Sequence, residues 1–194
     1  MINENFVYFG ALLSLLGGGG YLIETLKGRV KPNRVTWFFW ALAPLIAFFA
    51  QIKQGVGILA MTTFMAGFVP LLIFTASFVN KKAYWNLTKF DIGCGIFAAF
   101  GLIGWIATRN GNVAILFGIL ADGLAALPTL VKGYKAPLTE DYRLFLLGAS
   151  SASITLLAIT KWTFEYYAFP LYLLIITLMI SAAILIGRKK KNFE

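Results

Sequence analysis

The sequence predicts an all-α integral membrane protein with seven transmembrane helices, its N-terminus outside and its C-terminus in the cytoplasm. Hydrophobic residues make up 59% of the 194-residue chain and charged residues 13%, whereas soluble domains have roughly 25% charged residues. The apolar residues form seven long runs, and lysine and arginine gather in alternate loops between them. One small water-soluble core cannot bury this much apolar surface, so lipid is the expected solvent.

Each apolar run approaches the ~20 residues that a membrane-spanning helix needs. The runs are continuous rather than alternating, which favours helices over strands. The first run follows an acidic lead-in without a basic start, so we interpret it as a span and not as a signal peptide. The predicted spans are Phe6–Thr25, Val35–Ile52, Val56–Val79, Asp91–Thr108, Asn112–Val131, Leu144–Thr160 and Tyr166–Gly187.

Basic residues set the predicted orientation. Of the 17 lysines and arginines, 14 fall in the first, third and fifth loops and the C-terminal tail, and 3 (Lys53, Arg109 and Lys161) fall on the other side. The positive-inside rule therefore places the tail in the cytoplasm. Aromatic residues at span edges fit interfacial anchoring: Tyr84, Trp85, Trp162, Tyr166 and Tyr167.

Composition also limits the chemistry. The chain has no histidine and a single cysteine, Cys94, which excludes an internal disulfide, a His/Cys metal site and a Cys–His nucleophile pair. No cofactor, metal or enzyme motif is expected. The basic residues that give the net charge of +9 lie between apolar spans rather than on one soluble face. This argues against nucleic acid as a partner. The expected partners are the lipid bilayer and a small-molecule substrate, and a homo-oligomer is left open.

An internal repeat is predicted from two similar loops. An offset of 105 residues aligns Lys27-Gly28 with Lys132-Gly133 and Pro32 with Pro137. The same offset places the first and second spans on the fifth and sixth, and the third span nearly on the seventh. The chain then divides into a three-helix repeat (1–80), a linker helix (81–110) and a second repeat with a basic tail (111–194). Because one helix joins them, the two repeats have parallel orientations in the membrane.

The segment Leu127-Pro-Thr-Leu-Val-Lys-Gly-Tyr-Lys135, with this 3+1+3 arrangement, resembles the SWEET and PQ-loop transporter fold family, which includes the PnuC-type vitamin transporters. The match covers the whole chain as topology but about ten residues as a motif. Thr129 replaces the family's glutamine, and the first repeat lacks the matching proline. The asparagines of the family's sugar transporters are missing from the third and seventh spans, and Thr36-Trp-Phe-Phe-Trp40 matches the vitamin transporters loosely.

The resemblance implies a transporter or facilitator of a small polar molecule that is sugar-, vitamin- or nucleoside-like. Two helical repeats would rock about a mid-membrane site in alternating access, within a prokaryotic cytoplasmic membrane. The alternative is a non-transporting receptor, scaffold or accessory subunit on the same fold, because a fold does not fix a function.

Asp122 is the leading candidate for a substrate-binding residue. A carboxylate near the centre of a span costs about 2.5–3.5 kcal/mol on insertion scales, so it faces a bundle interior, a watery cavity or a partner. It would contact a cationic substrate or bind a proton. The alternative is a structural hydrogen bond to a neighbouring helix.

Further substrate-binding candidates share helix faces. Trp37 and Trp40 are three residues apart and would form a stacking wall, unless they serve in packing or at the interface. Ser150 and Ser153 would line a cavity opposite Asp122, or bond helix to helix. Tyr21 and Asn112 are weaker candidates; the full set is Asp122, Trp40, Trp37, Ser150, Ser153, Tyr21 and Asn112.

Hinge residues are expected in both repeats. Pro128 removes a backbone hydrogen bond in the fifth span. Four consecutive glycines would make the first span flexible and remove side-chain bulk next to the cavity, or they would allow close helix packing. They are Gly17, Gly18, Gly19 and Gly20. Near the cytoplasmic end of the first span, Glu24 is expected to pair with Lys27 or another base of the loop. Asp91, Glu140 and Asp141 are expected at helix starts, where carboxylates are stabilising.

Overall fold

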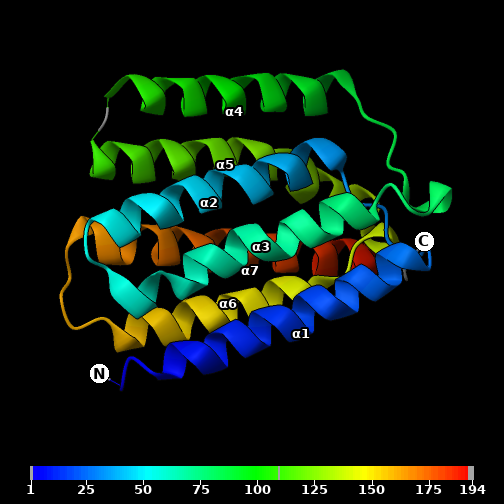
Figure 1. The fold of residues 1–194 in the computed structure, drawn as a ribbon. Coiled ribbons are helices and arrows are strands. Elements are labelled where there is room, and N and C mark those ends of the chain that lie inside the picture. The colour runs from blue at the N-terminus through cyan, green and yellow to red at the C-terminus, as the bar shows by residue number, and fades with distance from the viewer. Residues whose placement is uncertain (1, 109, 192–194) are drawn as a thin grey trace.

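The protein is all-helical in its computed structural model, which describes residues 2–108 and 110–191. Seven α-helices and three short 3₁₀ helices account for the regular structure of these residues, and no strand occurs among them (Figure 1). The α-helices are α1 (Phe6–Leu26), α2 (Arg34–Lys53), α3 (Met61–Ala76), α4 (Lys89–Thr108), α5 (Gly111–Lys135), α6 (Tyr142–Ala158) and α7 (Phe164–Lys191). The 3₁₀ helices are η1 (Gly57–Ala60), η2 (Lys81–Ala83) and η3 (Pro137–Thr139).

Each predicted apolar run coincides with one α-helix. Five helices are long and apolar enough to cross a membrane: α1, α2, η1 with α3, α5 and α7. Helix α6 is apolar but has 17 residues. In α4 the side chains of residues 101, 102 and 104–108 lie outside the described part of the chain, as does Arg109. Helices α5 and α7 each continue four residues beyond the predicted span, because their basic ends remain helical.

Polar residues define where several helices start. Asn33 and Asn110 accept hydrogen bonds from the backbone N–H groups that open α2 and α5, and Asp141 does the same for α6. At α4, Asp91 Oδ2 accepts from the Thr88 N–H at 2.6 Å and Thr88 Oγ1 accepts from the Asp91 N–H at 3.2 Å. These caps satisfy backbone donors that have no partner inside the helix.

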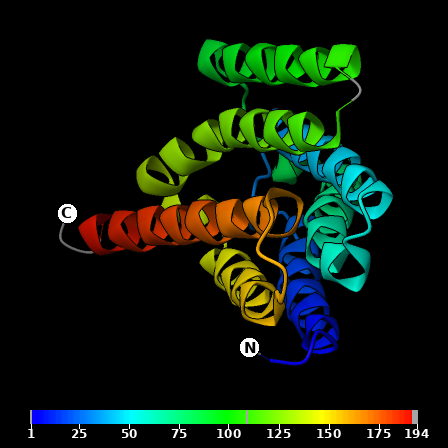
Figure 2. The same ribbon diagram turned by 90° about the vertical axis from the view of Figure 1, so that its left-hand side faces the viewer.

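Six helices form a ring around the core, and α4 stands outside it. Helix α3 packs between α1 and α2, and α7 packs between α5 and α6. The ring closes because α1 packs against α6 and α2 packs against α5. Helix α4 packs mainly on α5 and also contacts α2 (Figure 2). Consecutive helices run in opposite directions along the bundle (Figure 1).

The two ends of the bundle differ in charge. Hydrogen bonds join the first and fifth loops (Lys31 N–H to the Thr139 carbonyl, 3.1 Å) and the third loop to the end of α1 (Asn80 Nδ2 to the Leu26 carbonyl, 2.8 Å). These loops and the end of α7 therefore lie together; we call this the basic end. The N-terminus lies at the opposite end (Figure 1).

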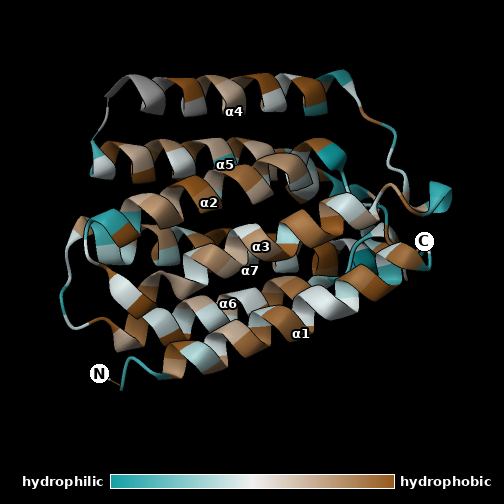
Figure 3. Ribbon diagram, viewed as in Figure 1, coloured by the Kyte–Doolittle hydropathy of each residue, from teal (hydrophilic) through white to brown (hydrophobic). Residues whose placement is uncertain are grey.

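Many large apolar side chains are exposed, and hydrophobic residues predominate along the helices between the two ends (Figure 3). Phe97 and Phe100 of α4 are 62% and 63% exposed, and Phe49 of α2 is 62% exposed. Hydrophilic residues are concentrated in the loops at either end (Figure 3). An apolar girdle between polar ends is the surface that a lipid-embedded helix bundle needs.

Glycines set the distances between ring helices. A Cβ on Gly17 would meet the Leu144 Cα of α6 at 3.2 Å, and one on Gly18 would meet Val69 Cγ1 of α3 at 2.5 Å. Small residues let membrane helices approach closely, which increases their van der Waals contact. Gly28, at φ +73°, has the left-handed conformation that lets the chain leave α1. The aligned Gly133 instead stays inside α5.

The glycine run offers a matched test of this packing. We expect Gly18→Ala to destabilise the protein by about 1–3 kcal/mol, because the added methyl overpacks against buried Val69. Gly20→Ala should leave stability unchanged or raise it, because nothing lies within 4 Å of that Cβ position. Thermal unfolding in detergent measures both. Equal effects of the two substitutions would contradict the packing described here.

Candidate functional site

A cavity of about 90 Å³ lies inside the ring of six helices. Every ring helix contributes to its wall. The lining residues are Ser14 of α1, Trp37 and Trp40 of α2, Thr62, Met65, Ala66, Val69 and Pro70 of α3, Asp122 of α5, Leu144, Phe145 and Gly148 of α6, and Leu173, Ile176, Thr177 and Ile180 of α7. This volume accommodates several water molecules.

Asp122 is the one ionisable side chain among these lining residues, and it is only 3% exposed. Tyr172 Oη of α7 donates a hydrogen bond to Asp122 Oδ2 at 2.6 Å. Trp40 Nε1 of α2 donates to the Asp122 backbone carbonyl at 3.2 Å. The carboxylate therefore has a hydrogen-bond donor across a helix interface and also borders the cavity.

Aromatic rings line one side of the cavity. Trp37 and Trp40 pack edge to face with centroids 5.2 Å apart, and Trp40 meets Phe145 of α6 at 6.0 Å. The sequence prediction that the two tryptophans share a face holds, and both border the cavity. Tyr21 lies against Trp37 at 4.9 Å, on α1. Flat aromatic faces next to a carboxylate suit a ligand that combines a ring or apolar body with a donor or cationic group.

Three further candidates lie away from the cavity lining. Ser150 is exposed, and its hydroxyl donates to the Leu146 carbonyl at 3.0 Å. Ser153 bonds the Ala149 carbonyl at 2.9 Å within the same helix. Asn112 is exposed at the start of α5. The structure brings Asp122, Trp37 and Trp40 together but not these three.

The small polar side chains in the cavity wall come from residues that sequence reasoning did not select. They are Ser14, Thr62 and Thr177. Thr62 Oγ1 also shares a 2.5 Å hydrogen bond with Thr155 Oγ1, which joins α3 to α6 near the end opposite the basic end. Ser14 and Thr177 stand alone among apolar residues and Thr62 is followed only by Thr63, so the sequence carried no helical spacing signal for them. Tyr172 was missed for the same reason.

The predicted hinge residues all lie within continuous helices. Gly17 and Gly18 are buried in helix contacts, while no atom lies within 4 Å of the Cβ positions of Gly19 and Gly20. Helix α5 passes through buried Pro128 and continues to Lys135. The glycine contacts agree with the close-packing alternative, and the hinge role stays a prediction.

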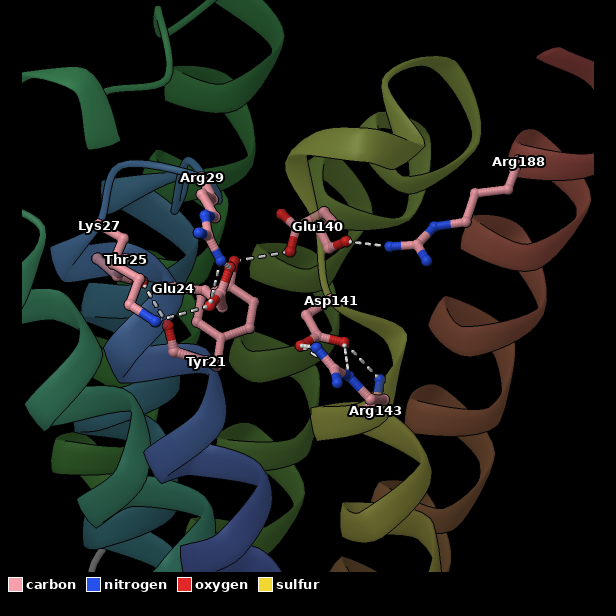
Figure 4. A network of polar contacts seen from close by, with 9 residues as sticks. All are labelled: Tyr21, Glu24, Thr25, Lys27, Arg29, Glu140, Asp141, Arg143 and Arg188. Carbon is pink, nitrogen blue, oxygen red and sulfur yellow. Dashed lines mark hydrogen bonds and ion pairs between the residues drawn. The ribbon is translucent and has the colours of Figure 1, made fainter. Parts of the chain in front are cut away.

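A second polar cluster lies at the basic end, around the carboxylate of Glu140. Lys132 Nζ contacts Glu140 Oε1 at 2.6 Å, with side chains 1% and 0% exposed. Tyr21 Oη of α1 donates to Glu140 Oε2 at 2.7 Å. Arg188 of α7 donates to the Glu140 carbonyl at 2.8 Å (Figure 4). We call Tyr21, Lys132 and Glu140 the Glu140 cluster.

Both carboxylates expected before the sixth span precede α6, and Asp141 is the one that caps it. Asp141 caps α6 as predicted, and its carboxylate pairs with Arg143 at 2.9 Å. Glu140 instead turns inward, because η3 folds the fifth loop over the end of α5, where Lys132 is buried. Glu24 does pair with bases of its own loop, Lys27 at 3.7 Å and Arg29 at 3.3 Å (Figure 4).

Comparison of the chain with protein-family models, curated proteins and solved structures finds no match. Among the described residues, no group of three His, Cys, Asp or Glu side chains is placed to hold a metal ion. The site is therefore interpreted from its own geometry.

The Asp122–Tyr172 hydrogen bond can be measured by a double-mutant cycle. Tyr172→Phe should cost about 1–3 kcal/mol, because it leaves a buried carboxylate without that donor. Combined with Asp122→Asn, the loss should be smaller than the sum of the single losses by at least about 0.5 kcal/mol. Chemical or thermal unfolding in detergent gives these values.

Tyr166→Phe is a matched control for that cycle. Its hydroxyl also donates a hydrogen bond, here to the Gly55 backbone carbonyl at 3.1 Å in an exposed position. Water can replace this bond, so stability should change by less than about 0.5 kcal/mol. Strict additivity of the Asp122 and Tyr172 substitutions would mean that the two side chains are not coupled.

Proposed function

We propose that this protein is a membrane transporter or facilitator of a small polar molecule that binds in the cavity beside Asp122. The observation that carries the proposal is the placement of one carboxylate and an aromatic wall in a cavity lined by all six ring helices. The proposed mechanism is rocking of two helical trios, α1–α3 and α5–α7, about that cavity.

The proposed topology has seven spans, in the arrangement 3+1+3, with the basic end in the cytoplasm. Alternating helix directions and the clustering of basic loops at one end support it. Helix α6 rises about 25 Å at ~1.5 Å per residue. This is short of a ~30 Å hydrocarbon core, so flanking residues such as Ile159 and Thr160 complete that crossing.

Two features of the fold support the repeat. The 105-residue offset carries the first residue of α1 onto the first residue of α5, and the last residue of α2 onto the last residue of α6. In each trio the third helix packs between the other two. The offset pairs α1 with α5 and α2 with α6. The contact of α1 with α6 therefore corresponds to the contact of α5 with α2. Two parallel repeats about an axis along the membrane normal have this symmetry.

The cavity as described is smaller than the ~300–1,000 Å³ pockets that hold drug-sized ligands. A substrate of sugar, nucleoside or vitamin size requires the trios to separate. We therefore interpret the structure as a closed form of the carrier. The Asp122 carboxylate would receive a donor or cationic group of the substrate, or a coupling proton, while Trp37 and Trp40 stack on its apolar part.

The second candidate is a receptor or scaffold on the same fold, without transport. The observation that favours it is the Tyr172 hydrogen bond, which already gives Asp122 a partner on another helix. In this alternative the carboxylate fixes packing between α5 and α7, and the cavity has no ligand.

A ligand screen separates the two candidates. Purified protein in detergent is heated with sugars, nucleosides, vitamins, amino acids and small organic cations. Transport predicts that one class raises Tm, because a ligand at about 100-fold its Kd adds about 2.7 kcal/mol of stability. Asp122→Asn and Trp40→Phe should each abolish that shift in Tm, or raise the ligand concentration needed to produce it by about tenfold or more. Both variants should still fold.

Asn112→Ala is the matched control for the screen. The Asn112 side chain is exposed at the start of α5 and is not among the residues that line the cavity. This variant should keep the full ligand response. If no class of compound raises Tm, and Asp122→Asn only lowers folded yield, the scaffold alternative is the better account.

A further inference from the structure

We infer that the Glu140 cluster is a latch that holds the two trios together at the basic end and closes the cavity on that side. This inference rests on the proposed transport function for its meaning, because it names the gate of the same cavity. Its test, however, needs no substrate.

The cluster joins the trios through one carboxylate. Glu140 Oε1 is held by Lys132 of its own trio at 2.6 Å, and Oε2 is held by Tyr21 of the other trio at 2.7 Å. Lys132 Nζ also donates to the Lys31 carbonyl in the first loop. The Lys31 N–H in turn donates to the Thr139 carbonyl at 3.1 Å, next to Glu140. Separation of α1 and the first loop from α5 and the fifth loop would break these three contacts at the basic end.

The burial of the cluster is unusual for its position. Lys132 and Glu140 lie near helix ends, where water is accessible, yet their side chains are 1% and 0% exposed. Trp85 contributes to this burial, since Lys132 Nζ lies 4.8 Å from the centre of its ring. A buried ion pair seldom adds net stability over apolar packing, whereas loss of one partner is costly. Such a pair is better suited to specify one arrangement of the helices than to stabilise the fold.

The latch is mechanically connected to the cavity. The Tyr21 ring that donates to Glu140 packs on Trp37 at 4.9 Å, and Trp37 lines the cavity. Phe145, which follows the fifth loop on α6, lines it too and meets Trp40. The aromatic wall therefore lies next to the cluster. Movement of Tyr21 away from Glu140 would carry α1 away from the fifth loop and open a path past Trp37.

Other ion pairs described at this end join residues of a single trio. Arg143 pairs with Asp141 in the first turn of α6, and Lys27 and Arg29 pair with Glu24 on the first repeat. Figure 4 shows these pairs beside Tyr21 and Glu140. They provide matched controls, because they carry the same kinds of charge at the same end but join residues of one trio.

Cysteine accessibility tests the latch in membranes. Ile176, which lines the cavity on α7, is replaced by cysteine in a Cys94→Ala background. A membrane-impermeant maleimide is added on the side of the basic end, and the rate at which it labels this cysteine is measured. Vesicle sidedness is assigned with Arg29→Cys, since Arg29 is exposed at that end. Adding Tyr21→Phe to the Ile176→Cys protein should speed labelling about tenfold, the population change that loss of a charge-assisted hydrogen bond produces.

Glu140→Gln should speed labelling by at least as much, and Arg143→Gln should leave the rate within about twofold. Tyr21→Phe keeps the ring on Trp37, so it tests the latch even where Glu140→Gln fails to fold. An unchanged rate in folded Tyr21→Phe protein overturns the inference, including when Tm falls, because the cluster is then only structural. If labelling is faster but no compound in the ligand screen raises Tm, the latch is supported and the transport proposal is contradicted.

Discussion

The outer surface of the bundle is apolar over most of its length, and this constraint governs the rest of the structure. Phenylalanines and isoleucines on α2 and α4 stand exposed between polar ends. Lipid offers backbone and side-chain polar groups no partners, so they must find them inside the protein. Helices satisfy the backbone. Polar side chains buried inside the ring need partners there, and Asp122 accordingly bonds Tyr172. At the basic end the buried Glu140 carboxylate bonds Lys132 and Tyr21.

Close helix contact without a strong hydrophobic drive requires small residues. Gly17 and Gly18 bring α1 against α6 and α3, and α5 packs on α2 at Gly118, where an added Cβ would lie 3.4 Å from Ala47 Cβ. These contacts lie between the trios as well as within them. The interface between the trios also carries bulky packing, such as Trp40 against Phe145, and hydrogen bonds such as Trp40 to the Asp122 carbonyl and Thr62 to Thr155. The proposed rocking would break such contacts on one side of the cavity, and the Glu140 cluster is the polar tie at the basic end.

The helix positions could be predicted from the sequence because apolar runs and basic loops are local signals. The position of Asp122, Trp37 and Trp40 beside an internal cavity could also be predicted. A lone carboxylate within a span and two tryptophans one turn apart are conspicuous in the sequence. The spacing of Ser150 and Ser153 showed that they share a face, but not that this face turns away from the cavity; the rotation of α6 is set by its contacts with α1 and α7. Tyr172 and the pairing of Lys132 with Glu140 were not predictable, since they depend on how α7 and the fifth loop fold back on α5.

The central claim is that lipid surrounds two trios of the same orientation. The most direct measurement is the sidedness of single cysteines in a Cys94→Ala background, at Arg29 in the first loop, Leu138 in the fifth loop and Lys161 in the sixth, with an impermeant reagent in intact cells. The account predicts that Arg29→Cys and Leu138→Cys react only after the membrane is opened, and that Lys161→Cys reacts at once. Reaction of the first two positions from opposite sides of the membrane would contradict it.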